Sequence, residues 1–532
     1  MNYKILIWLI GILSAYSVTA QDLHQEWGTW EHWGEQPNGT YRNPIIPADY
    51  SDLDCIKVGS EYYAITSTFQ FSPGMTVMRS IDLVNWEIIS HAVPDITQIT
   101  SELNYDKMNR YEGGIWAGTI RYHNNRFYVY FGTPQEGFFM TSAKSAYGPW
   151  EPLTPLLQEK GWDDCSVYWD KKGKGYFIGT NFSSKIEEYK TYMFPMTPDG
   201  KKIDRSKATL IHQGGGREAN KIIEHEGKFY IIYSEYTPNI GRYVMASRSN
   251  KIMGPYKEEK HLLLTNAIAN QPNQGGIIEG PNGKWYFFTH HGKGDFGGRQ
   301  ASLLPVTWID GWPIIGHVLP QGIGTMIWSE KMPIVTSEKL KIKRSDDFSE
   351  PQLQQQWHWN YQPNAQLFSL TERPGWMRMK AIRPIEAGNL MKTGNILSQR
   401  SYMTKQNDVT TCIDLQGLTE GVHAGLCHYT KQNASVGVKY ENGKKFIEYS
   451  IDGQWKEVVE IHSSTLWLRS RWGLSGVSYF SYSTDGETFI TIPENYQLSW
   501  GNYKGDRIGI YCYNPLKEEG YIDVDYLTYI IE

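Results

Sequence analysis

Aromatic pairs recur along the first part of the chain at intervals that predict a repeated β-structure. Each pair follows a short turn rich in glycine or asparagine, as in VGS-E, HNN-R, KGK-G, HEG-K and PNG-K. Successive pairs lie 65, 49, 53 and 56 residues apart. These intervals are too long for a helical solenoid and fit one four-stranded sheet per unit, so they predict a five-bladed β-propeller. The pairs are Tyr62-Tyr63, Phe127-Tyr128, Tyr176-Phe177, Phe229-Tyr230 and Trp285-Tyr286.

A second motif follows three of these pairs and supports the repeat. We expect each copy to mark the outer strand of a blade and its turn, in blades 1, 2 and 4. The copies are SIDLVNWE at 80–87, SAYGPWEP at 145–152 and SNKIMGPYKE at 249–258.

The pattern changes after a charged stretch at 337–347. Hydrophobic and polar residues then alternate, as in WMRMKA, and hairpin signals stand at Asn442-Gly443, Asp452-Gly453 and Asp485-Gly486. Strands of this spacing without the five-unit repeat fit a β-sandwich. Because helical periodicity is almost absent, the sequence predicts an all-β protein with two domains.

The chain of 532 residues is long enough for both domains and for a leader. Residues 1–20 carry an early lysine, an apolar run and a small-residue ending, which is typical of an export signal. Residues 21–40 form a polar lead segment, 41–335 the propeller and 346–532 the C-terminal sandwich. Because no other stretch approaches about 18 apolar residues, we expect an exported protein, periplasmic or secreted from a bacterium, without a membrane partner.

The charge and the cysteine content limit the kinds of partner and of metal or disulfide site that we expect. Without Lys4 the mature chain has 51 basic and 57 acidic residues, and this mild acidity argues against nucleic acid as a partner. The five cysteines lack CxxC spacing, so neither a metal site nor a disulfide framework is indicated. A Cys412–Cys427 bridge is one alternative, and buried thiols are the other. The 14% aromatic content fits stacking on sugar rings and equally a tyrosine-rich β core.

Three carboxylates stand at equivalent positions of the repeat. Asp52 lies ten residues before its aromatic pair, Asp164 lies twelve residues before its pair, and Glu218 lies eleven residues before its pair. Trp116 and Gln274 take the equivalent position in blades 2 and 5. In a propeller these positions lie on the innermost strands, around one axis. Converging carboxylates spread their pKa values apart and so suit acid–base chemistry.

Hydrolysis of a glycoside needs one protonated carboxylic acid and one ionised carboxylate. Asp52 and Glu218 come from blades 1 and 4, and a separation of roughly 6.5–9.5 Å would leave room for a water and give inversion. Asp164 would raise the pKa of the acid and hold it in place. A single Asp before a strand is more often a turn or cap residue, but three at equivalent positions favour a site. Asp54, Asp163 and Asp170 lack this register and are interpreted as structural.

Several further residues are candidates for binding substrate, each with a plainer alternative. His290 and His291 would lie near the mouth of the funnel or simply hydrogen-bond in place. Arg299, in a glycine-rich loop, would bind sugar hydroxyls or stay on the surface. Trp116 would stack on a sugar ring or pack in the core. The remaining candidates are Phe69 and Phe71 as an apolar wall and Gln274 as a cation ligand or a partner of water.

These motifs resemble glycoside hydrolase family 43, in particular its two-domain bacterial β-xylosidases and α-L-arabinofuranosidases. The resemblance rests on NPIIPADYSDLDCIKVGSEYYAITSTFQFSPGM, GGIWAGTIRYHNNRFYVYF, WDDCSVYWD, EANKIIEHEGKFYIIYSE and GGRQASLLPVTWIDGWPIIG, and downstream on DDFSEPQLQQQWHWN. It implies a five-bladed propeller with a concanavalin-like jelly-roll sandwich, and inversion. It places the general base on Asp52, the pKa-modulating aspartate on Asp164, the general acid on Glu218 and the sugar-contacting arginine on Arg299.

The resemblance also defines departures and alternatives. Leu53 and Gly118 stand where the family has prolines, which loosens the backbone near the pocket without removing a catalytic group. Gln274 stands where many members place the histidine of a central calcium site, so no cofactor is required and calcium is an open alternative. The expected activity is exo-acting release of xylose or arabinofuranose from hemicellulose oligosaccharides. Endo-hydrolysis of arabinan and a non-catalytic carbohydrate-binding propeller are the alternatives.

Overall fold

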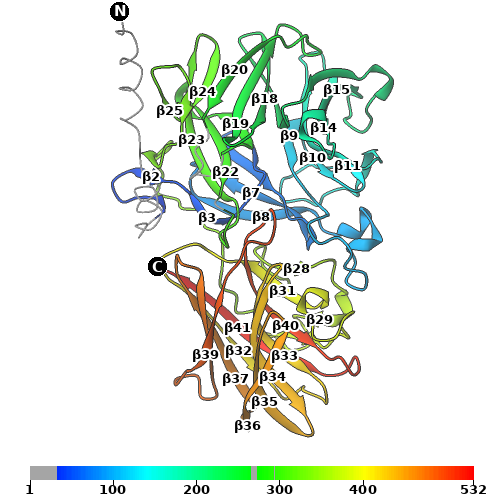
Figure 1. Ribbon diagram of the computed structural model, residues 1–532, viewed down its shortest axis with the longest axis vertical. Coiled ribbons are helices and arrows are strands. Elements are labelled where there is room, and N and C mark those ends of the chain that lie inside the picture. The colour runs from blue at the N-terminus through cyan, green and yellow to red at the C-terminus, as the bar shows by residue number, and fades with distance from the viewer. Residues whose placement is uncertain (1–32, 265–271, 293) are drawn as a thin grey trace, which may run out of the picture.

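Two all-β bodies lie one above the other in this computed structural model, which describes residues 33–264, 272–292 and 294–532 (Figure 1). The upper body is a propeller and the lower body is a sandwich. The predicted export signal and most of the lead segment lie outside the described residues. Among the described residues, no helix is long and apolar enough to cross a membrane.

Five four-stranded antiparallel sheets form the blades of the propeller. The aromatic pairs lie on the second strand of each blade. Blade 1 is β4 (Asp54–Val58), β5 (Glu61–Thr66), β7 (Gly74–Ser80) and β8 (Trp86–Val93); blade 2 is β9 (Gly118–His123), β10 (Arg126–Thr133), β11 (Gly137–Ala143) and β12 (Thr154–Leu157). Blade 3 is β13 (Trp162–Trp169), β14 (Gly175–Asn181), β15 (Lys190–Met196) and β16 (Thr209–Gln213); blade 4 is β17 (Glu218–His225), β18 (Lys228–Thr237), β19 (Gly241–Ser249) and β20 (Glu258–Leu263). Blade 5 is β21 (Gly275–Glu279), β22 (Trp285–His291), β23 (Gln300–Ile309) and β24 (Trp312–Ile315).

The innermost strands of the blades form a closed ring, since β4, β9, β13, β17 and β21 contact one another in turn and β21 returns to β4. Strand β3 (Ile46–Asp49), which precedes blade 1, pairs with β23 of blade 5 and so ties the two ends of the propeller together. The predicted outer motifs lie in the turns that lead into β8, β12 and β20. Smaller strands complete the domain: β25 (His317–Val318) and β26 (Gly324–Thr325) extend blade 4, and β1 (Gly34–Glu35), β2 (Thr40–Arg42) and β27 (Ser329–Lys331) form a separate sheet.

The turns explain why the aromatic pairs mark the blades so regularly. In blade 2, Asn124 and Asn125 both have positive φ, +48° and +56°, and in blade 4 Glu226 and Gly227 have +48° and +75°. A two-residue turn with both φ positive matches the right-handed twist of paired strands. Of the ten side chains in these pairs, eight are buried, and Phe229 and Trp285 are half-buried.

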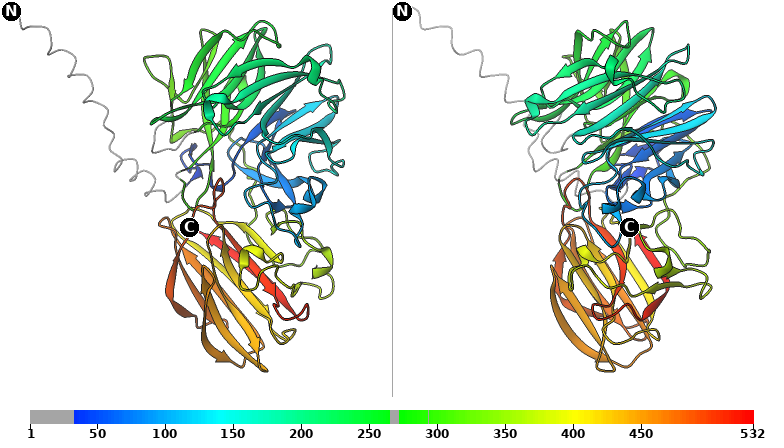
Figure 2. Two further views of the ribbon diagram at one scale, coloured as in Figure 1. Left: turned by 45° about the vertical axis from the view of Figure 1, so that its right-hand side comes forward. Right: turned by 90° about the vertical axis from the view of Figure 1, so that its right-hand side faces the viewer.

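Two stacked antiparallel sheets form the sandwich (Figure 2). The predicted hairpins at 442–443, 452–453 and 485–486 join β34 to β35, β35 to β36 and β38 to β39. One sheet is β36 (Gln454–Ile461), β35 (Lys444–Ile451), β34 (Asn433–Glu441), β33 (His423–Tyr429), β40 (Arg507–Tyr513), β31 (Ile396–Arg400), β28 (His358–Asn360) and β6 (Phe71–Ser72). The other is β29 (Phe368–Ser369), β30 (Met377–Lys380), β41 (Tyr521–Ile531), β32 (Asn407–Asp414), β37 (Thr465–Trp472), β38 (Val477–Ser483) and β39 (Ile490–Gln497). Short 3-10 helices lie at Ile96–Gln98, Ser101–Leu103, Ile186–Glu188, Arg205–Lys207, Pro281–Gly283, Ala365–Leu367 and Leu390–Lys392.

The two domains share a sheet and a core. Strand β6, an excursion from blade 1, pairs with β28 at the edge of the sandwich. One hydrophobic cluster contains Trp86 and Phe288 of the propeller together with Trp357 and Trp359 of the sandwich. This packing fixes the sandwich against one side of the propeller. All five cysteines are buried and free, so the Cys412–Cys427 alternative is wrong.

Candidate active site

A cavity of about 630 Å³ opens where the innermost strands begin, at one end of the propeller axis. It contains all three carboxylates singled out from the repeat: Asp52 immediately before β4, Asp164 within β13 and Glu218 at the start of β17. Its described lining consists of Asp52, Phe69, Trp116, Ala117, Pro134, Asp163, Asp164, Phe182, Tyr189, Glu218, Arg242, Asn273, Gln274, His290, Gly292, Gly294, Arg299, Trp500 and Tyr503.

Irregular backbone aims the carboxylates into this cavity. Strand β13 shifts register between Asp163 and Ser166, and β17 shifts between Glu218 and Lys221. Such bulges turn side chains away from the regular alternation of a strand and are frequent beside active sites. Asp52 and Asp164 also have positive φ, +57° and +54°. Strained conformations of this kind persist where the surrounding structure holds them.

A bidentate ion pair holds Asp52. The guanidinium of Arg299 donates to both carboxylate oxygens, Nη1 to Oδ1 at 2.7 Å and Nη2 to Oδ2 at 3.0 Å. Burial is the largest single effect on the pKa of Asp52 and raises it, but the charge of Arg299, the nearby His290 and the hydrogen bonds that the carboxylate accepts together outweigh burial, so the pKa lies below its ordinary value. Asp52 is therefore ionised at neutral pH, as a general base must be.

The neutral imidazole of His290 orients the same aspartate. Its Nδ1 accepts the backbone N–H of Asp52 at 2.8 Å, so that nitrogen carries no proton. Burial and then the charge of Arg299 lower the pKa of His290 to about 3, which keeps the ring neutral. His290 thus holds the backbone of Asp52 in place beside the cavity.

Glu218 has the opposite protonation preference. Burial raises its pKa to about 7; Arg242, whose Nη2 lies 3.0 Å from Oε1, opposes this shift, and the charges of Asp164 and Asp52 add to it. A carboxyl with such a pKa retains a proton close to neutral pH and can donate it. The environments of Asp52 and Glu218 therefore separate the pKa values of the two carboxyls, as a base and an acid would require.

Asp164 is fixed by three contacts from blades 4 and 5. Its Oδ2 accepts the backbone N–H of Ala219 at 2.8 Å, and its Oδ1 accepts from Nε2 of Gln274 at 2.7 Å. Its carbonyl oxygen accepts from the side chain of Asn220 at 3.0 Å. Burial raises the pKa of Asp164, while the Ala219 amide and the charge of Lys221 pull it back. Ala219 itself has a φ of +63°, so the residue after Glu218 is strained to make this contact.

One wall of the cavity is aromatic and belongs to both domains. The ring of Trp116 lies 6.1 Å from that of Phe69 and 5.1 Å from that of Tyr503, centroid to centroid. Tyr503 comes from a sandwich loop between β39 and β40, and its carbonyl oxygen accepts from Nε of Arg299 at 3.0 Å. Trp500 of the same loop also lines the cavity. The sandwich therefore closes one side of the site.

The structure corrects two site assignments. Phe71 does not line the cavity: it lies on β6, is 1% exposed and packs against Tyr429 in the sandwich, because the excursion that carries it pairs with the other domain. Asp163, interpreted as structural, does line it. Burial and the charge of Asp164 raise the pKa of Asp163 well above its ordinary value.

The other assignments agree with the geometry. His291 pairs with Ser302 at 2.8 Å within blade 5 and is not part of the described lining. Asp54 forms a buried ion pair with Arg121 at 2.6 Å, and Asp170 accepts turn amides, so both are structural. Phe69, Trp116, Gln274, His290 and Arg299 all line the cavity.

Arg242, Tyr189, Trp500 and Tyr503 were missed by the sequence reasoning. Arg242 lies on the third strand of blade 4, outside the repeat position, and only its ion pair with Glu218 reveals it. Trp500 and Tyr503 lie nearly 300 residues beyond Glu218. No local pattern predicts which loop of a second domain reaches the axis of the first.

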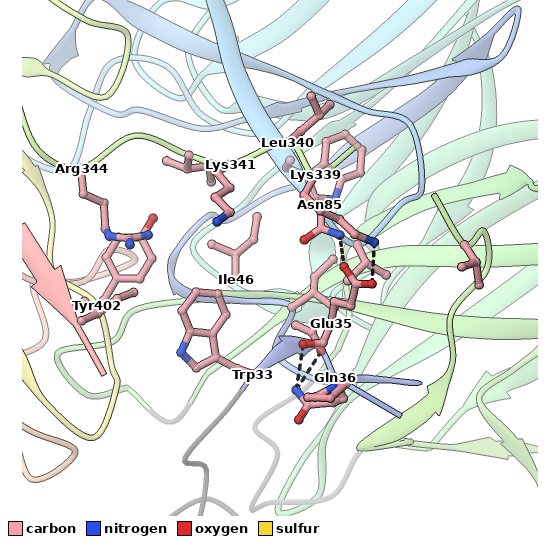
Figure 3. A pocket seen from close by; sticks show the side chains of 18 of the residues that line it. Trp33, Glu35, Gln36, Ile46, Asn85, Lys339, Leu340, Lys341, Arg344 and Tyr402 are labelled. Carbon is pink, nitrogen blue, oxygen red and sulfur yellow. Dashed lines mark hydrogen bonds and ion pairs between the residues drawn. The ribbon is translucent and has the colours of Figure 1, made fainter. Parts of the chain in front are cut away.

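A second cavity, of about 690 Å³, lies between β1, the connection at 335–344 and the sandwich (Figure 3). Glu35 is the only carboxylate among its described lining residues, and it is already held by Lys339 at 2.5 Å and by Asn85 at 2.9 Å. Trp33, Tyr402 and Arg344 form much of the remaining wall (Figure 3). Without a second carboxylate this cavity cannot supply an acid and base pair, although it is slightly larger than the propeller cavity.

Comparison with known proteins agrees with this chemistry. The chain is 34% identical over 545 residues to a beta-xylosidase of Formosa agariphila, covering 93% of this chain and 91% of that protein. It is 29% identical to a non-reducing end alpha-L-arabinofuranosidase of Bacteroides ovatus, covering 64% of this chain and 65% of that protein. A solved structure of a bifunctional GH43-CE protein of Bacteroides eggerthii superposes with a TM-score of 0.81 at 26% identity, covering 92% of this chain and 64% of that one.

Family models divide the chain as the structure does. Residues 345–530 match the beta xylosidase C-terminal concanavalin A-like domain, which is the sandwich. Residues 41–313 match the model of glycosyl hydrolases family 43 and cover the five blades with all three carboxylates. On this match and the 34% identical relative, the chain belongs to glycosyl hydrolase family 43.

Proposed function

We propose that this protein is an exo-acting, inverting glycosidase that releases terminal xylose or arabinofuranose from hemicellulose oligosaccharides such as those of xylan. The observation that carries the proposal is the cavity shared by two carboxyls of opposite protonation preference: Asp52 and Glu218 line one pocket, and Tyr503 and Trp500 of the sandwich wall one side of it. A pocket blocked on one side suits the end of a chain. The names of the two curated relatives support xylose and arabinofuranose as the sugars.

The alternatives fit these observations less well. Endo-hydrolysis of arabinan needs an open groove through which a chain passes, whereas the sandwich loop occupies one side of this cavity. A non-catalytic binding module has no use for a buried carboxyl with a pKa near 7 beside an ionised one, because burying such groups is costly.

The residues divide the reaction into two proton transfers. Glu218 donates its proton to the glycosidic oxygen as the bond from that oxygen to the anomeric carbon breaks. Asp52 accepts a proton from a water whose oxygen bonds to the anomeric carbon on the opposite face. The products are a free sugar of inverted configuration and a shortened oligosaccharide, and solvent returns the proton from Asp52 to Glu218. Arg299 keeps Asp52 ionised between turnovers, and Asp164 helps to keep Glu218 protonated.

Release of p-nitrophenol from the β-D-xylopyranoside and the α-L-arabinofuranoside tests the proposal. Purified protein should cleave at least one of them, and the ratio of the two kcat/KM values decides which sugar is preferred. Xylo-oligosaccharides should lose single sugars from one end. Failure to cleave either glycoside or any oligosaccharide would reject the proposal and favour a binding role.

The pH dependence of kcat should be bell-shaped with an alkaline limb near pH 7. Glu218 must be protonated, and its pKa is about 7, so activity falls as pH rises through that value. Asp52 must be ionised, and its lowered pKa places the acid limb below about pH 4. The measurement is kcat from pH 3 to 9, with melting temperatures over the same range to exclude unfolding. Activity that keeps rising above pH 8 would contradict the assignment of Glu218.

Loss of the Tyr503 ring should weaken binding more than chemistry. Tyr503→Ala removes one aromatic wall but keeps the carbonyl that accepts from Arg299, so KM should rise about tenfold with kcat within about threefold. Tyr503→Phe should behave as the wild type, and Tyr479→Ala, at an exposed position of the sandwich, is the control. A fall in kcat without a change in KM would show that the loop acts on catalysis and not on binding.

We also propose that residues 1–20 direct export to the periplasm or the medium, where hemicellulose fragments are found. The proposal rests on the sequence of that segment alone. Fractionation of the producing cells tests it, since retention of the protein in the cytoplasm would reject it.

A further inference from the structure

A buried lysine joins two blades of the propeller close to the acidic pocket. Lys221 lies on β17, the innermost strand of blade 4, three residues after Glu218, and is 1% exposed. Its Nζ donates to the carbonyl oxygen of Gly118 at 3.1 Å. Gly118 begins β9, the innermost strand of blade 2. Because blade 3 lies between these two blades, the lysine side chain reaches past the innermost strand of blade 3 and joins two blades that are not neighbours.

The surroundings explain why a cation should lie there. The cavity concentrates the carboxyl groups of Asp52, Asp163, Asp164 and Glu218 at one end of the channel. Arginines pair with two of them, Arg299 with Asp52 and Arg242 with Glu218. Asp164 is held by the neutral amides of Ala219 and Gln274. A buried ammonium is costly unless opposite charge compensates it, and Asp164 supplies that charge.

The same strand connects Lys221 to the catalytic acid. Four successive residues of β17 serve one site: Glu218 is the acid, Ala219 and Asn220 bind Asp164, and Lys221 crosses to blade 2. Any shift of Lys221 therefore moves the residues that hold Asp164. Gly118 is two residues beyond Trp116, so the bond to its carbonyl also fixes the start of the strand that follows the aromatic wall.

The channel does not fit a calcium ion. Among the described residues no group of three or more His, Cys, Asp and Glu side chains is arranged to hold a metal. Gln274, the one residue at the repeat position with an amide oxygen, turns its nitrogen to Asp164. Calcium takes six to eight oxygen ligands, and the ammonium group of Lys221 already lies among the innermost strands.

We propose that Lys221 is the resident cation of the channel and a positioning residue for the reaction, keeping Asp164 ionised and in place beside the catalytic acid. The inference rests on the proposed glycosidase function. Burial raises the pKa of Asp164 and Lys221 opposes that rise, while ionised Asp164 in turn raises the pKa of Glu218. The charged groups facing Glu218 are Arg242, Asp164, Asp52 and Arg299, and those facing Asp164 are Lys221, Asp52, Asp163 and Glu218.

Removal of the charge should therefore move the pH profile in a defined direction. Without Lys221 a larger fraction of Asp164 is protonated, its effect on Glu218 weakens, and the pKa of Glu218 falls. Lys221→Met and Lys221→Gln should each lower kcat at pH 7 at least about tenfold with little change in KM, and should shift the alkaline limb of kcat down by about one pH unit. Lys221→Arg, which retains the charge, should keep the limb in place, and Lys171→Met, at an exposed turn, is the control.

Three results would overturn the proposal. The first is an unchanged alkaline limb in the two neutral variants, which would leave Lys221 as a structural tie between blades. The second is an alkaline limb of kcat that is normal in Lys221→Gln but shifted in Lys221→Met. Glutamine can donate a hydrogen bond but carries no charge, so this result would mean that the hydrogen bond matters and the charge does not. The third needs no variant: a wild type that loses turnover in EDTA and regains it with calcium would place a metal in this role. Turnover by the wild type tests the proposed glycosidase function, whereas the variants test the role of Lys221. Failure of one claim can therefore be distinguished from failure of the other.

Discussion

Replacement of Glu218 by glutamine should abolish hydrolysis of natural oligosaccharides while sparing substrates that need no acid. A sugar alkoxide is a poor leaving group and must be protonated as it departs, so kcat on xylobiose or an arabinofuranosyl oligosaccharide should fall about 10²–10⁴-fold. A dinitrophenolate leaves without a proton, so the matching aryl glycoside should lose far less. The ratio of the two losses measures the proton transfer itself.

The matched control for this experiment is Glu226→Gln. Glu226 lies in the turn that follows the same strand, and its side chain is 81% exposed. Its replacement should leave the rates on both substrates unchanged. Equal losses of Glu218→Gln on both leaving groups would mean that Glu218 supports the fold of the pocket and is not the acid. Melting temperatures of both variants separate loss of folding from loss of chemistry.

Replacement of Asp52 by asparagine should show the complementary pattern. The water loses its base whichever group departs, so kcat should fall about 10²–10⁴-fold on natural and aryl substrates alike. Azide is already anionic and needs no proton removed. It should restore part of the turnover on a β-glycoside by forming the α-glycosyl azide, with the carbon–nitrogen bond forming as the carbon–oxygen bond breaks.

Asp170→Asn is the control for that substitution, because Asp170 lies outside the cavity and accepts from turn amides and from the hydroxyl of Tyr176 within blade 3. Asp52→Asn also removes the carboxylate to which Arg299 donates two hydrogen bonds, and this could destabilise the fold. The melting temperature of the variant must therefore be measured together with its rates. Full activity of Asp52→Asn, or a loss confined to one class of leaving group, would contradict its assignment as the base.

Most of the fold was predictable because local chemistry repeats. Each aromatic pair follows a turn that needs positive φ, as at Asn124 and Asn125, and this combination fixes the second strand of every blade. Counting back from the pairs then locates the innermost strands, which is why Asp52, Asp164 and Glu218 were found without a structure. The three hairpin signals of the sandwich are equally local.

The remainder of the site depends on contacts that no local pattern records. The bulge and the positive φ at Asp164 and Ala219 arise from how neighbouring blades meet. In the sequence Lys221 resembles an ordinary surface lysine of a strand, and only the assembled ring of blades shows that it is buried. Phe71 shows that a local pattern can also predict a site residue wrongly. It is two residues from Phe69 in the sequence, yet it lies on β6, which pairs with the sandwich and carries Phe71 away from the cavity.

The configuration of the released sugar tests the central claim most directly. Proton NMR during the first minutes of hydrolysis of a β-xyloside, or of an α-L-arabinofuranoside if that is the better substrate, shows the anomer before mutarotation. Because Asp52 activates a water and does not itself attack, the account predicts the inverted anomer, α-xylose from the β-xyloside. Initial release of β-xylose would mean retention through a covalent intermediate and would contradict the roles given to Asp52 and Glu218.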